Sequence, residues 1–191
     1  DCLKSVAFAE QIVVVDSHSS DDTVQIASDF GCDVFVKAWQ GFGPQKQSAI
    51  AHCRHRWVLI LDADERIPHE TALRIKEIVL YPSTAVAGYS FPRKNFFQGR
   101  WIRHAGWWPD RVIRLFQKDL GCMTQTMVHE SVEINGTVVA LDVPIEHFTE
   151  SHLSQILLKI NNYSTLGARK AFEEGKKASV LSAALRAFLT F

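Results

Sequence analysis

The first half of the chain alternates short apolar runs with amphipathic segments. Three runs predict strands: 12–15, 33–37 and 57–61. The first is continuously β-branched, as in a parallel strand that is covered on both faces. Segments with helical spacing follow each run: 23–30, 45–53 and 69–80. Gly31 closes the first helix and Pro68 opens the third, so the order predicts a doubly wound α/β sheet.

The second half of the chain has a different pattern. Four further strands are predicted: 88–92, 111–116, 131–134 and 137–141. Asn135-Gly136, between the last two, predicts a β-hairpin turn. An aromatic, arginine-bearing stretch covers 95–110, and the pattern is helical from His152 onward. We therefore expect a mixed-strand half followed by C-terminal helices.

These patterns divide the chain into a domain over 1–150 and a helical segment over 151–191. Leu3, Val6 and Ala7 have helical spacing and lead directly into the first strand. Because such a helix usually follows an earlier strand, we expect an N-terminal strand to be missing. The final residues still lie in an apolar helical pattern, so we expect the last segment to be incomplete as well.

Composition narrows the function classes. The 191 residues contain 21 Lys+Arg and 21 Asp+Glu, and this zero net charge argues against bulk binding to nucleic acid. The four cysteines lie far apart without a CxxC pair, which favours neither a zinc knuckle nor a disulfide scaffold. Scattered thiols of this kind fit a cytoplasmic location.

Acidic residues stand at the carboxyl ends of two predicted strands. Asp16 follows the strand at 12–15, and Asp62 and Asp64 follow the strand at 57–61. Open α/β sheets bind ligands at this end of their strands. Two carboxylates on a short loop can share one Mg²⁺ or Mn²⁺ with a diphosphate, since these cations prefer oxygen ligands. The alternative is a solvated loop before the next helix.

Three segments, in this order, resemble the family 2 glycosyltransferases of GT-A fold: VVVDSHSSDDT, GFGPQKQSAI and WVLILDADERIP. More narrowly, they resemble the bacterial branch that adds glucose to the lipopolysaccharide inner core. The likeness runs from Asp1 to about Tyr163. It implies a Rossmann-like nucleotide-sugar-binding sheet and an inverting transfer of a hexose from a nucleotide sugar, with UDP-glucose as the expected donor. The implied acceptor is a glycan or lipid-linked saccharide such as the lipopolysaccharide core.

The resemblance also assigns roles to residues on the donor side. It places Asp16 at the base or ribose, Lys46 at the nucleotide or its phosphates, and Asp62 near the ribose and diphosphate. Asp64, together with Asp62, would hold the divalent cation. His147 follows the last predicted strand, where some GT-A enzymes have a histidine that completes the metal shell; the alternative is a structural histidine.

Inverting transfer needs a base for the proton of the acceptor hydroxyl. The resemblance places this base in Val128-His-Glu130, with Glu130 as the expected residue and His129 as the alternative. A surface glutamate at the start of a strand is the other interpretation of Glu130.

Trp107-Trp-Pro-Asp-Arg111 looks like the segment that lines the donor–acceptor cleft. Aromatic faces stack on sugars and arginine holds phosphate, but packed core tryptophans explain the pattern equally well. Arg111 and Arg114 are three positions apart on a strand and face opposite sides, so at most one reaches the cleft. Arg111 is the expected donor-binding residue.

The C-terminal helices combine apolar and basic positions. They could rest on an anionic membrane surface, at the inner face of the cytoplasmic membrane, or pack on the domain as ordinary helices.

Two other functions share some of these features. A phosphatase with an aspartyl nucleophile also carries Asp-x-Asp after a strand, but it would have Thr or Val soon after the second Asp and the motif near its start. Here Glu65-Arg66 follows instead. A non-catalytic nucleotide-sugar or glycan-binding module derived from a glycosyltransferase is the second alternative. The joint presence of Asp16, Asp62, Asp64 and Glu130 argues against it.

Overall fold

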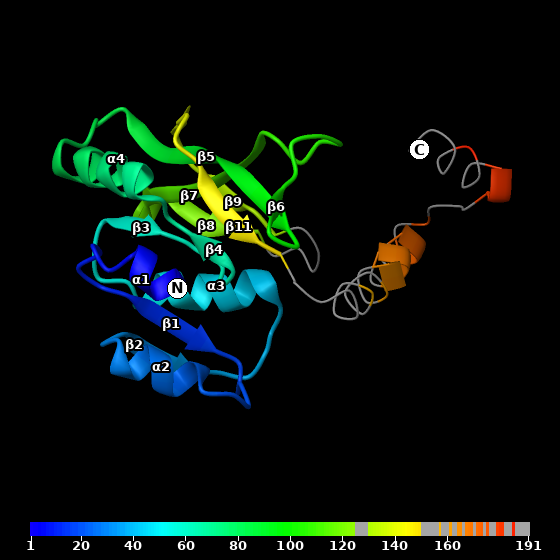
Figure 1. Ribbon diagram of the computed structural model, residues 1–191, viewed down its shortest axis with the longest axis horizontal. Coiled ribbons are helices and arrows are strands. Elements are labelled where there is room, and N and C mark those ends of the chain that lie inside the picture. The colour runs from blue at the N-terminus through cyan, green and yellow to red at the C-terminus, as the bar shows by residue number, and fades with distance from the viewer. Residues whose placement is uncertain are drawn as a thin grey trace. The chain divides into compact units, whose positions relative to one another are not determined.

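The computed structural model describes residues 1–124 and 130–149, and separate positions between 157 and 185. The chain divides into two compact units, Asp1–Ser151 and His152–Phe191. Figure 1 labels the elements of the first unit, which carries the predicted site.

The elements of this unit follow one another as α1 (Cys2–Ser5), β1 (Val13–Asp16), α2 (Thr23–Asp29), β2 (Asp33–Val36), α3 (Phe42–His52), β3 (Trp57–Leu59), β4 (Glu65–Arg66), α4 (His69–Leu80), β5 (Val86–Phe97), β6 (Arg100–Trp101), β7 (Asp110–Gln117), a 3₁₀ turn (Lys118–Leu120), β8 (Gly121–Met123), β9 (Val132–Ile134), β10 (Thr137–Ala140) and β11 (Ile145–Phe148).

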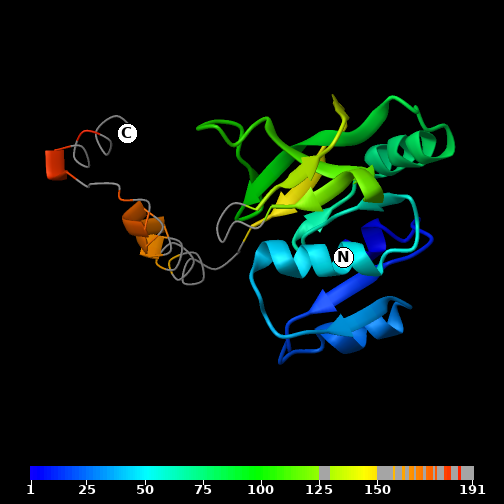
Figure 2. The ribbon, with the colours of Figure 1, turned by 180° about the vertical axis from the view of Figure 1, so that it is seen from behind.

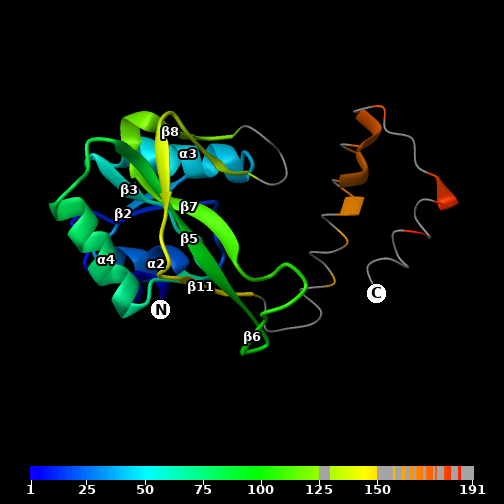
Figure 3. The same cartoon turned by 90° about the horizontal axis from the view of Figure 1, so that it is seen from above.

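In the described part of this unit, the strands form three sheets. β1 and β2 make a parallel pair joined by α2, and β8 and β9 make an antiparallel pair. The remaining strands form a seven-stranded sheet in the order β3-β7-β5-β11-β4, with β6 and β10 also paired to β5. Figure 3 shows the long strand β5 beside β7 and β11. Parallel and antiparallel pairs both occur in this sheet, so the expectation of a mixed-strand half is confirmed.

Helix α3 lies between the β1–β2 pair and the larger sheet in both Figure 1 and Figure 2. It packs on β1 on one side and on β8 on the other. Gly43 in its first turn allows this approach, because a Cβ there would overlap the carbonyl oxygen of Thr124. Its side chains therefore reach both halves of the domain.

The structure corrects two expectations about strand pairing. β3 does not continue the β1–β2 sheet but pairs antiparallel with β7, so the predicted doubly wound sheet is divided. The Asn135-Gly136 turn does not close a hairpin, because β9 pairs with β8 whereas β10 pairs in parallel with β5. Gly136, at a φ of 141°, comes so close to Ala87 of β5 that a Cβ would overlap it, and the chain crosses there to the edge of β5.

Two apolar clusters hold the sheet. One gathers Phe91, Leu115 and Ile145 with α4, and the other gathers Ile50 of α3 with Val58 and Phe116. These side chains fix β5, β7 and β11 relative to one another and to α3.

The register of these strands determines which polar residues meet. Arg93 of β5 lies opposite Asp110 of β7, and Asn95 of β5 lies opposite His147 of β11. On the other side of β11, His147 lies opposite Glu65 of β4. Because cross-strand partners point to the same face of a sheet, these five side chains are brought to one side.

Candidate functional site

The loop with Asp62 and Asp64 joins β3 to β4 and closes tightly. The amide of Glu65 donates to the carbonyl of Asp62 at 2.9 Å, and the carbonyl of Asp64 accepts from the amide of Phe148 at 2.9 Å. The loop is therefore fastened to β11 as well as to its own strands. This places both aspartates at the end of β3, as the sequence predicts.

Asp62 is held by two cations from different elements. Lys46 Nζ of α3 lies 2.6 Å from Asp62 Oδ1, and Arg114 Nη2 of β7 lies 2.8 Å from Asp62 Oδ2. Lys46 Nζ also lies 3.0 Å from Glu130 Oε1, so one ammonium joins the Asp-x-Asp loop to the expected base. Burial raises the pKa of Asp62, but Arg114 and Lys46 outweigh it, and the pKa lies below its usual value.

Glu65 and Arg114 form a buried ion pair behind Asp62. Glu65 is 0% exposed, and its Oε1 accepts from Arg114 Nη2 at 2.7 Å. Its Oε2 accepts from the amide of Asp62 at 3.2 Å, so the same carboxylate also fixes the loop. Burial lowers the pKa of Arg114, but Glu65 and Asp62 outweigh it and raise the pKa. A buried guanidinium held by two carboxylates orients both of them.

Asp64 belongs to a second series of polar contacts. Its Oδ2 lies 3.2 Å from His147 Nε2, and His147 Nδ1 lies 2.7 Å from Asn95 Oδ1. Asn95 Nδ2 donates to Asp110 Oδ2 at 3.1 Å, and Arg93 Nη2 donates to the same oxygen at 2.6 Å. Burial raises the pKa of Asp64, but the hydrogen bond from His147 and its positive charge, both present when the ring is protonated, outweigh burial and lower the pKa of Asp64 below its usual value.

Arg93 connects this second series of contacts to the contacts around Asp62. Its Nη1 lies 3.4 Å from Glu65 Oε1, the oxygen that also binds Arg114. The result is one continuous polar network, which contains five carboxylates (Asp62, Asp64, Glu65, Asp110, Glu130), three Lys/Arg cations (Lys46, Arg93, Arg114), His147 and Asn95. The carboxylates outnumber the Lys and Arg cations by two, which suits a divalent cation.

The residues expected to hold a metal fit only in part. Asp64, from the loop after β3, and His147, from β11, come together. The Asp64 side chain is 38% exposed and the His147 side chain 19% exposed. Asp62 is instead turned to Lys46 and Arg114. Within 1–124 and 130–149, no three His, Cys, Asp or Glu side chains gather as a metal cluster. Asp64 and His147 suit a cation that takes its other ligands from substrate and water, as Mg²⁺ commonly does.

Asp16 lies apart from this network. The residue is 5% exposed, and its carboxylate accepts from the hydroxyl of Ser19 and from the Ser19 amide, the latter at 2.9 Å. These hydrogen bonds hold the pKa of Asp16 below its usual value. The loop after β1 is joined to α3 by Gln45 Nε2, which donates to Ser17 Oγ at 2.8 Å. The next residue of α3 is Lys46, which belongs to the network. The loop that carries Asp16 and the network therefore both contact α3.

Arg111 and Arg114 do point to different partners, as their spacing predicts. Arg114, however, is the arginine that joins the carboxylates. Arg111 Nη1 donates to the carbonyl of Leu141 at 2.8 Å, and Nη2 lies 3.4 Å from the exposed Asp142. The structure therefore does not bring Arg111 to the predicted site.

The aromatic stretch packs largely against itself. Trp108 meets Trp101 edge-on at 5.2 Å between ring centroids, and Trp107 meets Phe97 edge-on at 6.4 Å. The guanidinium of Arg103 lies 4.1 Å from the Trp101 centroid. This favours internal packing for Trp101 and Trp108, whereas Trp107 stays 37% exposed.

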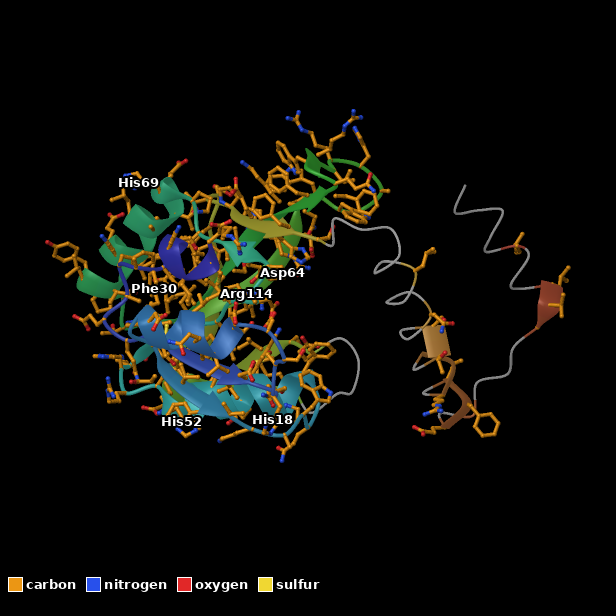
Figure 4. All side chains as sticks on the ribbon, turned by 60° about the horizontal axis from the view of Figure 1, so that its bottom comes forward. His18, Phe30, His52, Asp64, His69 and Arg114 are labelled. Carbon is orange, nitrogen blue, oxygen red and sulfur yellow. The ribbon has the colours of Figure 1, made fainter. Side chains whose placement is uncertain are left out.

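Figure 4 shows Asp64 and Arg114 near the middle of the domain, whereas His18, His52 and His69 lie at its periphery. His129, the alternative base, lies outside the described residues.

Sequence reasoning set Arg114 aside in favour of Arg111, and it missed four other residues of the network that supports the site: Glu65, Arg93, Asn95 and Asp110. Some signals were present. Glu65 directly follows Asp-Ala-Asp, and Arg93 and Asn95 are two positions apart, which puts them on one face of a strand. Their partners come from other strands and depend on the sheet register.

Residues 1–130 match the model of glycosyl transferase family 2, and the chain belongs to this family. The lipopolysaccharide core biosynthesis glycosyltransferase LpsC of Rhizobium meliloti is 31% identical over 188 residues, covering 92% of this chain and 67% of that protein. An uncharacterised glycosyltransferase of Rickettsia typhi is 30% identical over 180 residues. The chain covers 62% of the Rickettsia protein, and 89% of the chain is matched.

Among solved structures, mannosyl-3-phosphoglycerate synthase from Rubrobacter xylanophilus is similar, with a TM-score of 0.53 at 16% identity. The match covers 93% of this chain and 71% of that one. It supports the GT-A fold expected from the sequence. Enzymes of this fold and family generally use divalent cations. None of the helices in the described part of the chain has the length and apolar composition of a membrane-spanning segment.

Proposed function

We propose that this chain carries the donor site and base of an inverting glycosyltransferase, which moves a hexose from a nucleotide sugar to a glycan hydroxyl. The observation that carries this proposal is the position of Lys46. Its ammonium lies 2.6 Å from Asp62 and 3.0 Å from Glu130, so the Asp-x-Asp loop and the base share one cation. Family membership and the GT-A fold support the same reaction class.

On the donor side, Lys46 and Asp62 would bind the nucleotide sugar. A lysine ammonium has three N–H donors, and two of them are directed at Asp62 and Glu130. The third would bind a phosphate oxygen of the donor. Arg114 and Glu65 hold Asp62 in place without needing to touch the donor, since both are buried. Asp16 would contact the base or ribose from the loop after β1.

Asp64 and His147 are the residues that would hold Mg²⁺ or Mn²⁺. When bound, this cation would neutralise the negative charge of the leaving nucleoside diphosphate. The two excess carboxylates of the network favour such a cation at this point.

Glu130 would complete the reaction as the base. As the acceptor oxygen bonds to the anomeric carbon, the bond from that carbon to the diphosphate oxygen breaks, and the hydroxyl proton passes to a Glu130 oxygen. A single displacement of this kind inverts the anomeric configuration. The Glu130 side chain keeps 17% exposure, so an acceptor hydroxyl can reach it.

We further propose UDP-glucose as the donor and a lipid-linked saccharide of the lipopolysaccharide core as the acceptor. The similarity to LpsC, whose name refers to that core, supports the acceptor class. Among the described positions of the unit His152–Phe191, several apolar side chains are exposed: Leu157, Phe172, Val180, Leu181 and Leu185. They support contact with a membrane surface, where a lipid-linked acceptor lies.

A thermal-shift screen tests the donor. UDP-glucose, UDP-galactose and GDP-mannose are each added with and without Mn²⁺, because a ligand that binds only the folded state stabilises it by about 2.7 kcal/mol at 100 times its Kd. We expect UDP-glucose with Mn²⁺ to give the largest shift. If no nucleotide sugar adds to the effect of Mn²⁺ alone, the donor assignment is contradicted. Slow hydrolysis of the stabilising donor would separate an enzyme from a non-catalytic binding module.

A further inference from the structure

Asn95 is a buried amide in β5 that serves no role in the chemistry described so far. It is 6% exposed, and all its polar atoms are engaged. Nδ2 donates to the carbonyl of Trp107 and to Asp110 Oδ2, both at 3.1 Å. Oδ1 lies 2.7 Å from His147 Nδ1. This set of partners leaves the amide only one orientation.

The reason is that both partners of Nδ2 can only accept. A backbone carbonyl has no proton to give, and the Asp110 carboxylate is fixed by the Nε and Nη2 donors of Arg93 at 2.9 and 2.6 Å. Burial raises the pKa of Asp110, but its hydrogen bonds with Arg93 and Asn95 outweigh it, and the pKa lies below its usual value. The nitrogen of Asn95 must therefore face these two groups, and its oxygen must face the imidazole.

The orientation of Asn95 decides the tautomer of His147. Because Oδ1 is an acceptor, His147 Nδ1 must carry the proton, and in the neutral ring Nε2 then presents a lone pair. That lone pair points at Asp64 Oδ2, 3.2 Å away. The Nε2 lone pair and the Asp64 carboxylate would repel one another at this distance unless a cation lay between them. That cation is either a proton or a metal ion.

We infer that Asn95 is a positioning residue, which fixes His147 in the Nδ1–H tautomer so that Nε2 and Asp64 bind one divalent cation together. The inference rests on the cation site of the proposed function and adds the residue that prepares it. Arg93 and Asp110 belong to the same arrangement, because they set the orientation of Asn95. Partners of this kind behind a metal ligand commonly change metal affinity by 10- to 100-fold when removed.

The tautomer can be observed directly. The chain is labelled with ¹⁵N-histidine and studied free of metal, at a pH raised until the ¹⁵N signals show that the His147 ring is neutral. Of the eight histidine signals, the one missing in His147→Gln belongs to His147. We expect wild-type His147 to be the Nδ1–H form and Asn95→Leu to shift it toward the Nε2–H form. An Nε2–H tautomer in the wild-type protein overturns the inference, whether or not Asn95→Leu folds.

Calorimetric titration with MnCl₂ tests the consequence. We expect Asn95→Leu to weaken Mn²⁺ binding by roughly 10- to 100-fold. Gln117→Leu is the matched control: it also removes a buried amide, from the far end of β7, where Gln117 contacts Arg56 and the carbonyl of Val86. Its Mn²⁺ affinity should equal that of the wild type.

The outcomes separate this inference from the proposed function. Wild-type Mn²⁺ affinity in folded Asn95→Leu overturns the positioning role and leaves the cation site standing. If the wild-type protein binds no Mn²⁺, alone or with UDP, the cation site of the proposed function fails, and the inference fails with it.

Discussion

The two halves of the domain hold their acidic residues in different ways. In the β1–β2 half, the carboxylate of Asp16 is satisfied by Ser19, only three residues further along the chain. In the seven-stranded sheet, Asp62 and Asp64 are held by Arg114 and His147, which are 52 and 83 residues away. One site residue is thus arranged by its own loop, whereas the others depend on the assembly of the whole sheet.

This difference has a consequence for folding and for binding. The loop around Asp16 can form as soon as β1 and its turn exist, because its contacts are local. The network around Asp62 exists only when α3, β4, β5, β7 and β11 are all in place. Damage to the network should therefore affect stability and binding together, whereas damage at Asp16 should remain small and local.

The largest effect is expected from Glu65→Leu. This change leaves Arg114 buried without its closest partner, and breaking a buried ion pair in this way costs about 3–5 kcal/mol. Urea unfolding measures the loss. The double variant Glu65→Leu/Arg114→Met should recover part of it, since an apolar pair leaves no buried charge. A double variant no more stable than Glu65→Leu would contradict the pairing.

Glu130→Gln should abolish most transfer while the donor still binds. Loss of a general base lowers the rate by roughly 10²-fold or more. Turnover with UDP-glucose and thermal shift with the same donor give the two readouts. Glu133→Gln, an exposed change three residues away on β9, is the matched control and should keep full turnover. Equal turnover in both variants would remove Glu130 from the role of base.

Ser19→Ala should have a smaller effect that depends on pH. Asp16 has a lowered pKa in the folded protein, so its hydrogen bonds stabilise the fold above the unfolded pKa of about 3.9 and are lost as pH falls through the folded value. We expect the variant to be less stable by about 1 kcal/mol at pH 7. The difference from wild type should shrink in the acid range.

Urea midpoints at several pH values measure this effect. Ser20→Ala, an exposed neighbour, should behave as the wild type throughout. A Ser19→Ala penalty that stays constant into strong acid would show that the charge of Asp16 is not involved.

Arg111→Ala should be the mildest change. The Arg111 guanidinium contacts the carbonyl of Leu141 and the fully exposed Asp142. An ion pair at the surface contributes at most about 1 kcal/mol to the stability of the fold. We expect UDP affinity to stay unchanged in Arg111→Ala and to fall in Arg114→Ala, because Arg114 holds Asp62. Loss of UDP affinity in Arg111→Ala alone would return the donor-binding role to Arg111.

The comparison of the two halves also explains what could be predicted from the sequence. The β-branched run before Asp16 and the glycine after α2 are local signals, and β1, α2 and β2 form close to where they indicate. The Asp-Ala-Asp loop follows β3 as expected. Asn135-Gly136 is also a local signal, but it predicted the wrong pairing, since β10 pairs with β5 and β9 pairs with β8.

The supporting network could not be predicted in the same way. Glu65 follows two recognised aspartates but gives no sign of full burial until β4, β5 and β7 are assembled. The sequence favoured Arg111 over Arg114 as the donor-binding arginine, but their spacing shows only that the two side chains face different sides. In the folded sheet Arg114, which lies at the irregularity in the β5–β7 register, is the arginine that contacts Asp62.

The most direct test of the site is calorimetric titration of UDP into wild-type protein and Asp64→Ala, each with and without Mn²⁺. If Asp64 and His147 bind the cation that accompanies the donor, Mn²⁺ should strengthen UDP binding to the wild type, and Asp64→Ala should lose this gain. UDP affinity in Mn²⁺ that is the same for both proteins would contradict the assignment.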